Sequence, residues 1–297
     1  MPLASPLFSI VIPTYNRAHL IGKTIESVLR LDFPDFEILA IDDGSLDNTE
    51  EVVRKFTDPR VRYYKKENAE RGAARNYGSA RANGEYINFF DSDDIMHSNH
   101  LRVANKLIAA KGQPEFFHLA YDCQLENGSV VDRINNFDDA LPNTILFDNK
   151  LSCNGVFLRK DIALQYPFEE ERVLASSEDW ELWIRLVSRF KLHYSNEITS
   201  SVINHDQRSL RTIAPDKVVV RDVLFIEKLR QDKVVMHRYG RSFSRFVAER
   251  YTFFMLCFAE QGQRSEVLKW GIRALRIHPL ILVSKRFLAS IKNSIVK

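Results

Sequence analysis

Short apolar runs alternate with helical patterns along the first 90 residues of the chain. Four runs rich in β-branched and aromatic residues predict buried strands: FSIVI (8–12), FEILAI (36–41), VRYY (61–64) and EYINFF (85–90). Helices are predicted between them over residues 20–29, 50–56 and 72–83. Because strands and helices alternate, the pattern indicates an α/β fold with a mostly parallel sheet that helices cover on both faces.

Helical patterns also mark the later part of the chain. SSEDWELWIRLV (176–187) has a largely apolar helical pattern that two acidic residues open. Residues 212–297 are helical in pattern throughout, and Phe243–His278 resembles one tetratricopeptide-like helical hairpin. We therefore predict two parts, an α/β domain over residues 1–211 and a helical C-terminal extension over residues 212–297.

Polar segments follow three of the four predicted strands. They are PTYNR (13–17), DDGS (42–45) and DSDD (91–94). In open α/β sheets, ligands bind outside the carboxyl ends of the strands, and the carboxyl ends of parallel strands share one edge. The sequence therefore predicts a binding site that these three segments form together.

The residue types in these segments suit a nucleoside diphosphate held through a metal ion. Asp91 and Asp93 are two residues apart at a strand end, so both can reach one hard cation and leave positions open for water and phosphate oxygens. Such a cation neutralises charge on a departing phosphate. DDGS suits hydrogen bonds to a base or ribose, and Arg71 and Arg75 can pair with phosphate or carbonyl oxygens.

Composition and charge argue against several classes of protein. The net charge of +3 is too small to indicate nucleic-acid binding. The three cysteines form no CxxC pair, which predicts reduced thiols and neither a disulfide framework nor a zinc site. The longest nearly apolar stretch, Tyr251–Ala259, is far shorter than the roughly 20 residues of a membrane-spanning helix, and no signal peptide is visible. We expect a cytoplasmic protein.

Five segments together carry a family resemblance. FSIVIPTYNR, ILAIDDGSLDNTEEVV, NAERGAARNYG, GEYINFFDSDD and SSEDWELWIRLV, in this order, resemble the inverting family 2 glycosyltransferases of GT-A fold, over about residues 7–205. The resemblance implies a Rossmann-like mixed sheet flanked by helices. It also implies an enzyme that moves a sugar from a UDP- or dTDP-sugar to a hydroxyl of a saccharide or lipid-linked acceptor, in bacterial surface polysaccharide or glycolipid synthesis.

The resemblance also implies roles for individual residues. In that family the strand-end DxD motif binds a divalent metal, Mn²⁺ or Mg²⁺, together with the donor diphosphate. This implies that Asp93 and Asp91 are metal ligands, and His205 is a further candidate ligand. The family's ED motif implies that Asp179 is the catalytic base. Contacts to nucleotide or substrate are implied for a larger set: Pro13, Thr14, Tyr15, Arg17, Asp42, Asp43, Arg71, Arg75, Asp91, Ser92 and Glu178.

The same motifs allow other interpretations. A GT-A domain could bind nucleotide as a non-catalytic scaffold, although the intact Asp93 and Asp179 count against this. A phosphatase of the haloacid dehalogenase kind also ends a strand in DxD, but PTYNR and DDGS would then be unexplained. His205 fits a structural histidine as well as a ligand, and Glu178–Asp179 alone fits a helix N-terminus, where acidic residues are favoured.

The end of the chain is basic and amphipathic. Residues 264–297 hold eight Lys or Arg and one Glu, a net charge of +7, so the rest of the chain carries −4. Six apolar residues fall on one helical stripe: Leu280, Ile281, Phe287, Leu288, Ile291 and Ile295. Basic residues lie beside or behind it: Lys285, Arg286, Lys292 and Lys297. The layout predicts peripheral contact with the inner face of the cell membrane; the alternative is a stripe docked on the protein with a solvated basic face.

Overall fold

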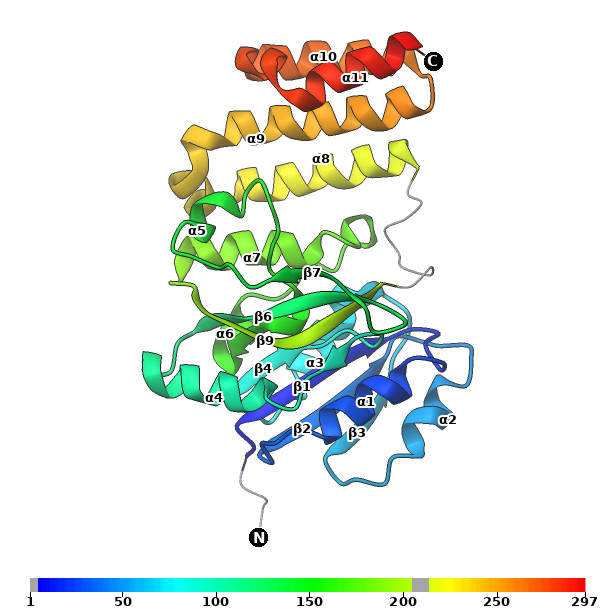
Figure 1. The fold of residues 1–297 in the computed structure, drawn as a ribbon, viewed down its shortest axis with the longest axis vertical. Coiled ribbons are helices and arrows are strands. Elements are labelled where there is room, and N and C mark those ends of the chain that lie inside the picture. The colour runs from blue at the N-terminus through cyan, green and yellow to red at the C-terminus, as the bar shows by residue number, and fades with distance from the viewer. Residues whose placement is uncertain (1–4, 205–213, 297) are drawn as a thin grey trace. The chain divides into compact units, whose positions relative to one another are not determined.

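The protein, described by a computed structural model over residues 5–204 and 214–296, divides into two compact units (Figure 1). The first unit contains residues 5–145 and 149–204 of this described part. The second contains residues 146–148 and 214–296. Each unit has its own apolar core, so each is treated below by itself.

The first unit is built from strands and helices that alternate along the chain. Its strands are β1 (Phe8–Thr14), β2 (Phe36–Asp42), β3 (Val61–Lys65), β4 (Tyr86–Phe89), β5 (Ile95–Met96), β6 (Phe116–Leu125), β7 (Val130–Ile134), β8 (Val156–Arg159) and β9 (His193–Asn204). Its α-helices are α1 (Ile21–Leu29), α2 (Thr49–Arg54), α3 (Glu70–Ser79), α4 (His100–Lys111), α5 (Leu141–Thr144), α6 (Lys160–Gln165) and α7 (Glu178–Arg189). Two short 3₁₀ turns are η1 (Cys153–Gly155) and η2 (Arg172–Leu174).

The strands form one mixed sheet, as predicted. Its order is β3-β2-β1-β4-β8-β6-β9-β5, and β7 pairs with β6 outside this path. The strands β1 to β4 are mutually parallel where they pair, which confirms the arrangement predicted from their alternation with helices. Beyond β4 the sheet is mixed, because β8, β5 and β7 pair antiparallel with their neighbours whereas β6 and β9 pair parallel, so the expectation of a mostly parallel sheet holds only in part.

Small residues let α3 approach the sheet closely. A Cβ atom on Gly78 would lie 2.4 Å from a methyl of Val11 and 3.1 Å from the Ile41 side chain. Real Cβ atoms do not come so near, so a larger residue at position 78 would push α3 off β1 and β2. This close packing brings the first turn of α3 near the carboxyl ends of the strands.

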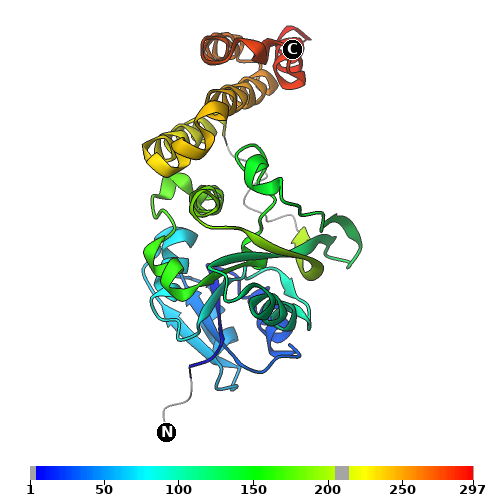
Figure 2. The same cartoon turned by 90° about the vertical axis from the view of Figure 1, so that its left-hand side faces the viewer.

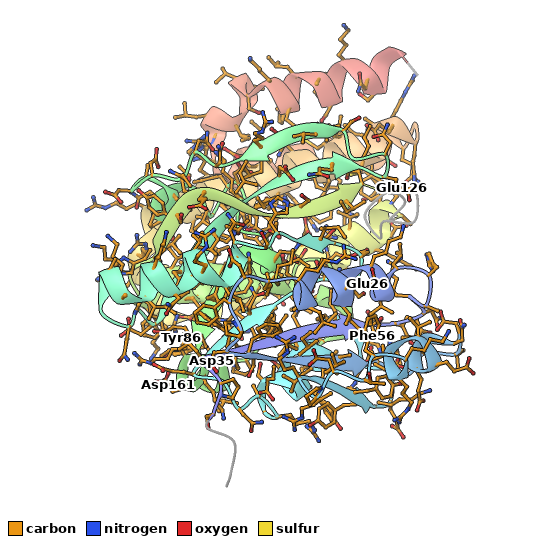
Figure 3. The ribbon with its side chains drawn as sticks, turned by 60° about the horizontal axis from the view of Figure 1, so that its bottom comes forward. Glu26, Asp35, Phe56, Tyr86, Glu126 and Asp161 are labelled. Atoms are coloured by element: carbon orange, nitrogen blue, oxygen red, sulfur yellow. The ribbon has the colours of Figure 1, made fainter. Side chains whose placement is uncertain are left out.

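The parallel part of the sheet has two edges. At the edge where β2 and β4 begin, Figure 3 labels Asp35, which precedes β2, and Tyr86, the first residue of β4. The opposite edge is where β1, β2 and β4 end, and there Thr14 is paired in register with Asp42. The three polar segments predicted to share an edge all lie at this second edge.

The second unit is helical, which confirms the predicted helical C-terminal extension. It contains α8 (Pro215–Gln231), α9 (Lys233–Glu260), α10 (Arg264–Ile277), the 3₁₀ turn η3 (Pro279–Val283) and α11 (Lys285–Val296). The helices α8, α10 and α11 all pack against α9 (Figures 1 and 2). Asp222 of α8 accepts a hydrogen bond of 2.9 Å from the Arg250 guanidinium of α9. In the described residues no helix has both the length and the apolar composition that a membrane span requires.

Candidate active site

Hydrogen bonds join the polar segments at the ends of β1 and β2. The backbone N–H of Asn16 donates to Ser45 Oγ at 2.9 Å, and the backbone N–H of Leu46 donates to Asn16 Oδ1 at 2.8 Å. From the same segment, the Arg17 guanidinium reaches to 3.7 Å from the Asp93 carboxylate after β4. The structure therefore brings together PTYNR, DDGS and DSDD.

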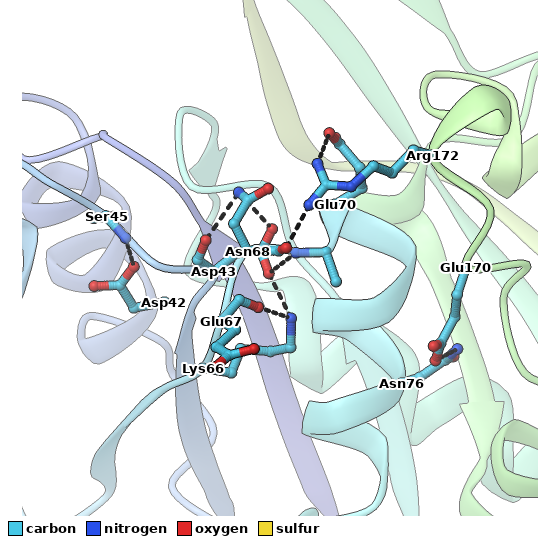
Figure 4. Close-up of polar contacts among 11 residues, drawn as sticks. Asp42, Asp43, Ser45, Lys66, Glu67, Asn68, Glu70, Asn76, Glu170 and Arg172 are labelled. Carbon is cyan, nitrogen blue, oxygen red and sulfur yellow. Dashed lines mark hydrogen bonds and ion pairs between the residues drawn. The ribbon is translucent and has the colours of Figure 1, made fainter.

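The two adjacent aspartates of DDGS are both buried and have different partners (Figure 4). Asp42 accepts hydrogen bonds from the backbone N–H of Ser45 at 2.7 Å and from the Tyr63 hydroxyl at 2.5 Å. It therefore shapes the turn after β2. Burial and the Asp42 carboxylate hold the pKa of Tyr63 well above its usual range, so this hydroxyl stays protonated and keeps donating.

Asp43 is held by the segment that follows β3. Its carboxylate accepts from Lys66 Nζ at 2.6 Å, from Asn68 Nδ2 at 3.1 Å and from the backbone N–H of Ala69 at 3.0 Å (Figure 4). Lys66 and Asn68 were missed in the sequence. The signal was present, because β3 ends at Lys65 and the rule that ligands bind beyond strand ends applies to this strand too.

The acidic cluster after β4 divides into accessible and buried carboxylates. The Asp91 side chain is 32% exposed and that of Asp93 is 15% exposed, whereas Asp94 is fully buried. Asp91 accepts a hydrogen bond of 2.9 Å from the Arg75 guanidinium. Asp91 and Asp93 are thus the two members of the cluster whose oxygens a ligand can reach.

Asp94 and Asn154 form a buried clamp under this cluster. Asp94 accepts from Asn154 Nδ2 at 2.6 Å and from the backbone N–H of Ile203 at 2.8 Å. Asn154 Oδ1 in turn accepts from the backbone N–H of Asp91 at 2.9 Å. The clamp fixes the turn that carries Asp91 and ties it to the end of β9. No motif in the sequence marks Asn154, because Asp91 and Asp94 are sixty or more residues away.

Arg75 of α3 is a buried cation between two carboxylates. It donates to Glu178 Oε1 at 2.8 Å and to Asp91 Oδ1 at 2.9 Å, and it is 2% exposed. Burial alone would lower the pKa of Arg75, but the surrounding acidic groups, Asp91 and Glu178 among them, raise it above its usual range. Arg71, one turn earlier, is 37% exposed, and its Nε lies 3.9 Å from Glu178. Arg75 therefore joins Glu178 at the start of α7 to Asp91 in the acidic cluster after β4.

Asp179 is the second residue of α7 and is partly exposed, in contrast to the buried Glu178 before it. The backbone N–H of Trp180 donates to Asp179 Oδ1 at 2.7 Å. Burial and the neighbouring Glu178 charge raise the pKa of Asp179 to about 6. A carboxylate with a pKa close to neutrality is well matched to proton transfer.

The segment between α6 and α7 holds the start of α7 against α3. Asn76 and Phe168 exchange two hydrogen bonds of 2.9 Å, one from the Asn76 amide and one from the Phe168 backbone. Arg172 pairs with Glu70 at 3.1 Å and donates to the backbone oxygen of Asn68 (Figure 4). The sequence offered no motif for this segment, yet it ties the residues that precede α7 to α3.

Backbone strain is concentrated in the site segments. Asn16, Glu70 and Ser176 have positive φ angles of 51°, 73° and 75°. Such conformations cost non-glycine residues on the order of 1–3 kcal/mol and persist only where surrounding contacts hold them. Here the contacts are those of Asn16 with the DDGS turn and of Glu70 with Arg172.

The remaining predicted residues occupy the same edge with different exposure. Pro13, Thr14 and Ser92 are buried, whereas Tyr15 is 45% exposed. His205 lies outside the described residues. In the part of the chain that the structure describes, no group of three or more His, Cys, Asp or Glu side chains is arranged to hold a metal. Asp91 and Asp93 still fit a hard cation, because Mg²⁺-type sites use one or two carboxylates and complete their shell with water and phosphate oxygens.

Comparison with known sequences identifies related proteins. Residues 9–113 match the family described as "Glycosyl transferase family 2". The chain is 31% identical to the UDP-Glc:alpha-D-GlcNAc-diphosphoundecaprenol beta-1,3-glucosyltransferase WfgD of Escherichia coli, over 61% of this chain and 70% of that protein. It is 28% identical to a putative teichuronic acid biosynthesis glycosyltransferase, TuaG of Bacillus subtilis, over 65% and 77% of the two chains.

Some relatives are much longer than the matched region. An uncharacterised glycosyltransferase of Rickettsia felis is 29% identical over 70% of this chain, but the match spans 36% of that protein. The corresponding share for a relative from Rickettsia bellii is 35%. The chain therefore spans about a third of the length of these two proteins.

Solved structures share the fold. TarS residues 1–349 of S. aureus in complex with UDP-GlcNAc superposes with a TM-score of 0.73 at 19% identity, over 97% of this chain and 88% of that one. The mannosyltransferase PcManGT of Pyrobaculum calidifontis in complex with GDP-Man and Mn²⁺ gives 0.60 at 15% identity, over 100% and 88%. The predicted GT-A fold is confirmed.

Proposed function

The chain belongs to glycosyl transferase family 2, and from this membership we propose that it moves a sugar from a nucleoside diphosphate donor to an acceptor hydroxyl, with inversion of the anomeric carbon. The observation that carries the proposal is the network in which Arg75 donates to Glu178, the neighbour of Asp179, and to Asp91 after the end of β4. Burial and the Glu178 charge raise the pKa of Asp179 to about 6. A proton acceptor thus lies next to a network that includes a carboxylate of the acidic cluster, which suits transfer from a diphosphate.

Asp179 is the base in this proposal. It takes the proton from the acceptor hydroxyl while the hydroxyl oxygen attacks the anomeric carbon. Attack on the face opposite the diphosphate forms the new glycosidic bond as the bond to the phosphate oxygen breaks, so the nucleoside diphosphate leaves and the carbon is inverted. With a pKa of about 6, Asp179 is mostly ionised at neutral pH and is more basic than an ordinary aspartate.

Asp91 and Asp93 would hold the cation that accompanies the donor diphosphate. Mn²⁺ or Mg²⁺ bound there would supply positive charge next to the departing phosphate. The Mn²⁺ in the PcManGT complex supports the use of a divalent cation. Arg17, 3.7 Å from Asp93, would keep the cluster partly neutralised before the cation and the donor bind.

The donor is proposed to be a UDP- or dTDP-sugar, and the acceptor a saccharide or lipid-linked saccharide. The UDP-GlcNAc in the TarS complex supports the donor, and the diphosphoundecaprenol in the name of WfgD supports a lipid-linked acceptor. Tyr15 is exposed after the end of β1 and would contact the nucleoside. The buried Asp43 belongs to a turn that would also face the nucleoside, and Lys66 and Asn68 hold this turn in place. The proposed pathway is surface polysaccharide or glycolipid synthesis.

Turnover of a nucleotide sugar tests the proposed function. We expect slow, Mn²⁺-dependent release of nucleoside diphosphate from one member of a donor panel, and faster release with crude lipid-linked acceptor, measured by a coupled nucleotide assay. The matched control is Asp161→Asn, which removes the carboxylate charge of an exposed ion pair with Arg159 at the opposite edge of the sheet and should leave the rate unchanged. Binding without turnover in the presence of the acceptor extract would favour a scaffold, and release of inorganic phosphate would favour a phosphatase.

The metal assignment makes a separate prediction. Asp93→Asn removes one of the two reachable carboxylate charges and should weaken Mn²⁺-assisted binding of UDP by at least about tenfold, because a neutral amide is a poorer ligand for a hard cation. Calorimetric titration of UDP with and without Mn²⁺ measures this. The fold should be unaffected, since the partly exposed ion pair with Arg17 at 3.7 Å contributes little to stability. Equal UDP affinity in variant and parent would remove Asp93 from the metal site.

A further inference from the structure

The second unit exposes aliphatic side chains on α10, η3 and α11. The described, exposed members, here called the C-terminal apolar surface, are Leu268, Ile272, Ile277, Leu280, Leu282, Val283, Leu288 and Ile291. Exposed apolar side chains that are scattered singly are normal, but three of these lie within the four residues 280–283, so this turn calls for a partner. The surface is most prominent at η3, where Leu280 and Val283 are 73% and 77% exposed.

The stripe predicted from sequence is split by the structure. Ile281 and Phe287 are buried in the core of the second unit, where they join a cluster that includes Trp270. Leu280 and Leu288 belong to the same predicted stripe but face water. The segment is therefore docked on its own unit through some residues and presents others outward. Because Ile281 anchors η3, the exposed side chains beside it are displayed on an ordered turn.

Basic side chains border this surface. On α10, the exposed Lys269, Arg273 and Arg276 follow one another at helical spacing beside the side that carries Leu268 and Ile272. After η3 come Lys285, Arg286 and Lys292, all exposed. Glu266 is the one acidic residue between positions 264 and 297, and it pairs with Lys269 at 2.8 Å. The surface thus combines an apolar turn with nearly uncompensated positive charge.

We propose that the C-terminal apolar surface docks on an anionic phospholipid bilayer. In this arrangement Leu280, Leu282 and Val283 enter the boundary between headgroups and acyl chains, and the surrounding Lys and Arg side chains meet lipid phosphates. An apolar turn with a basic border has the chemistry of an interfacial membrane element, whereas the net charge of +7 in residues 264–297 would oppose packing of two copies of the surface against each other. The inference does not depend on the proposed transferase reaction.

Vesicle co-sedimentation of the full chain tests the proposal. We expect binding to vesicles of mixed phosphatidylglycerol and phosphatidylcholine, weakening as salt is raised, and little binding to phosphatidylcholine alone. Lys285→Gln with Arg286→Gln should weaken binding about 25-fold, because each basic side chain near an anionic surface contributes ~1 kcal/mol. Leu280→Ser, Leu282→Ser and Val283→Ser together should weaken it at least about tenfold, since each buried CH₂ contributes about 0.8 kcal/mol.

A matched control uses the first unit. Val130→Ser, Val131→Ser and Leu164→Ser together remove three exposed aliphatic side chains, which are 40%, 51% and 50% exposed, and should leave vesicle binding unchanged. Absence of binding at low salt overturns the proposal, as does equal loss in the control. Self-association that the η3 triple variant abolishes, without vesicle binding, would also overturn it and would identify the surface as an interface between copies of the chain.

Discussion

Replacing Asp179 with Asn is expected to lower the rate of sugar transfer by about 10²–10⁴-fold, the usual contribution of a positioned general base. Asparagine keeps the size of the side chain, and its amide oxygen can still accept from the backbone N–H of Trp180, so the start of α7 should be preserved. The amide cannot take a proton from the acceptor hydroxyl. Donor binding, measured by titration of UDP with Mn²⁺, should therefore remain close to that of the parent.

The pH dependence gives a second readout of the same residue. Because burial and Glu178 raise the pKa of Asp179 to about 6, kcat/KM should fall as the pH drops through this value and the base becomes protonated. Because the pKa of Asp179 is raised in the folded protein, ionisation of this carboxyl lowers the free energy of unfolding. The destabilisation develops as the pH rises from the ordinary aspartate pKa to about 6. Asp179→Asn should thus be at least as stable as the parent at neutral pH and lose any advantage in acid. A variant that transfers sugar at the parent rate would place the base elsewhere, with Glu178 the next candidate.

The sequence predicted those features that depend on short stretches of chain. The strands β1 to β4 were visible as apolar runs, and their polar ends could be placed at one edge because parallel strands share direction. The same reasoning grouped Asp43, Asp91 and Arg17 before any contact was known. It would have reached Lys66 and Asn68 as well, had it been applied to the end of β3.

The parts that escaped prediction depend on contacts between distant residues. Asp94 looks like Asp91 and Asp93 in sequence, and its structural role appears only because Asn154 and the backbone of Ile203 occupy both of its oxygens. The antiparallel strands were missed for a related reason. β5 pairs with β9 and β8 with β4 through residues that are far apart in the sequence, so no local pattern indicates the partner or the direction.

The C-terminal extension illustrates a different limit. A helical stripe specifies which side chains share a face but not what covers that face. Ile281 and Phe287 pack inward, whereas Leu280 and Leu288 on the same stripe stay exposed. The two interpretations of the stripe, docking on the protein and contact with a membrane, therefore apply to different residues of one segment.

Replacing Arg75 with Met should be the most destabilising change in the site. The guanidinium is 2% exposed and bonded to both Glu178 and Asp91. Without it, two carboxylates lose their compensating charge, and breaking a buried ion pair in this way costs about 3–5 kcal/mol. Urea unfolding at neutral pH measures this loss.

The same substitution should move the pH profile of catalysis. The positive charge of Arg75 lowers the pKa of Asp179, against the raising effects of burial and Glu178. Its removal should therefore shift the acid limb of kcat/KM to higher pH, a change that a purely structural role would not produce. Arg71→Met is the matched control, since Arg71 is 37% exposed and 3.9 Å from Glu178, and it should cost less than about 1 kcal/mol. If Arg75→Met were as stable as the parent at neutral pH, another group would have to compensate the charges of the two carboxylates. Arg75 would then not be the link between the start of α7 and the segment after β4.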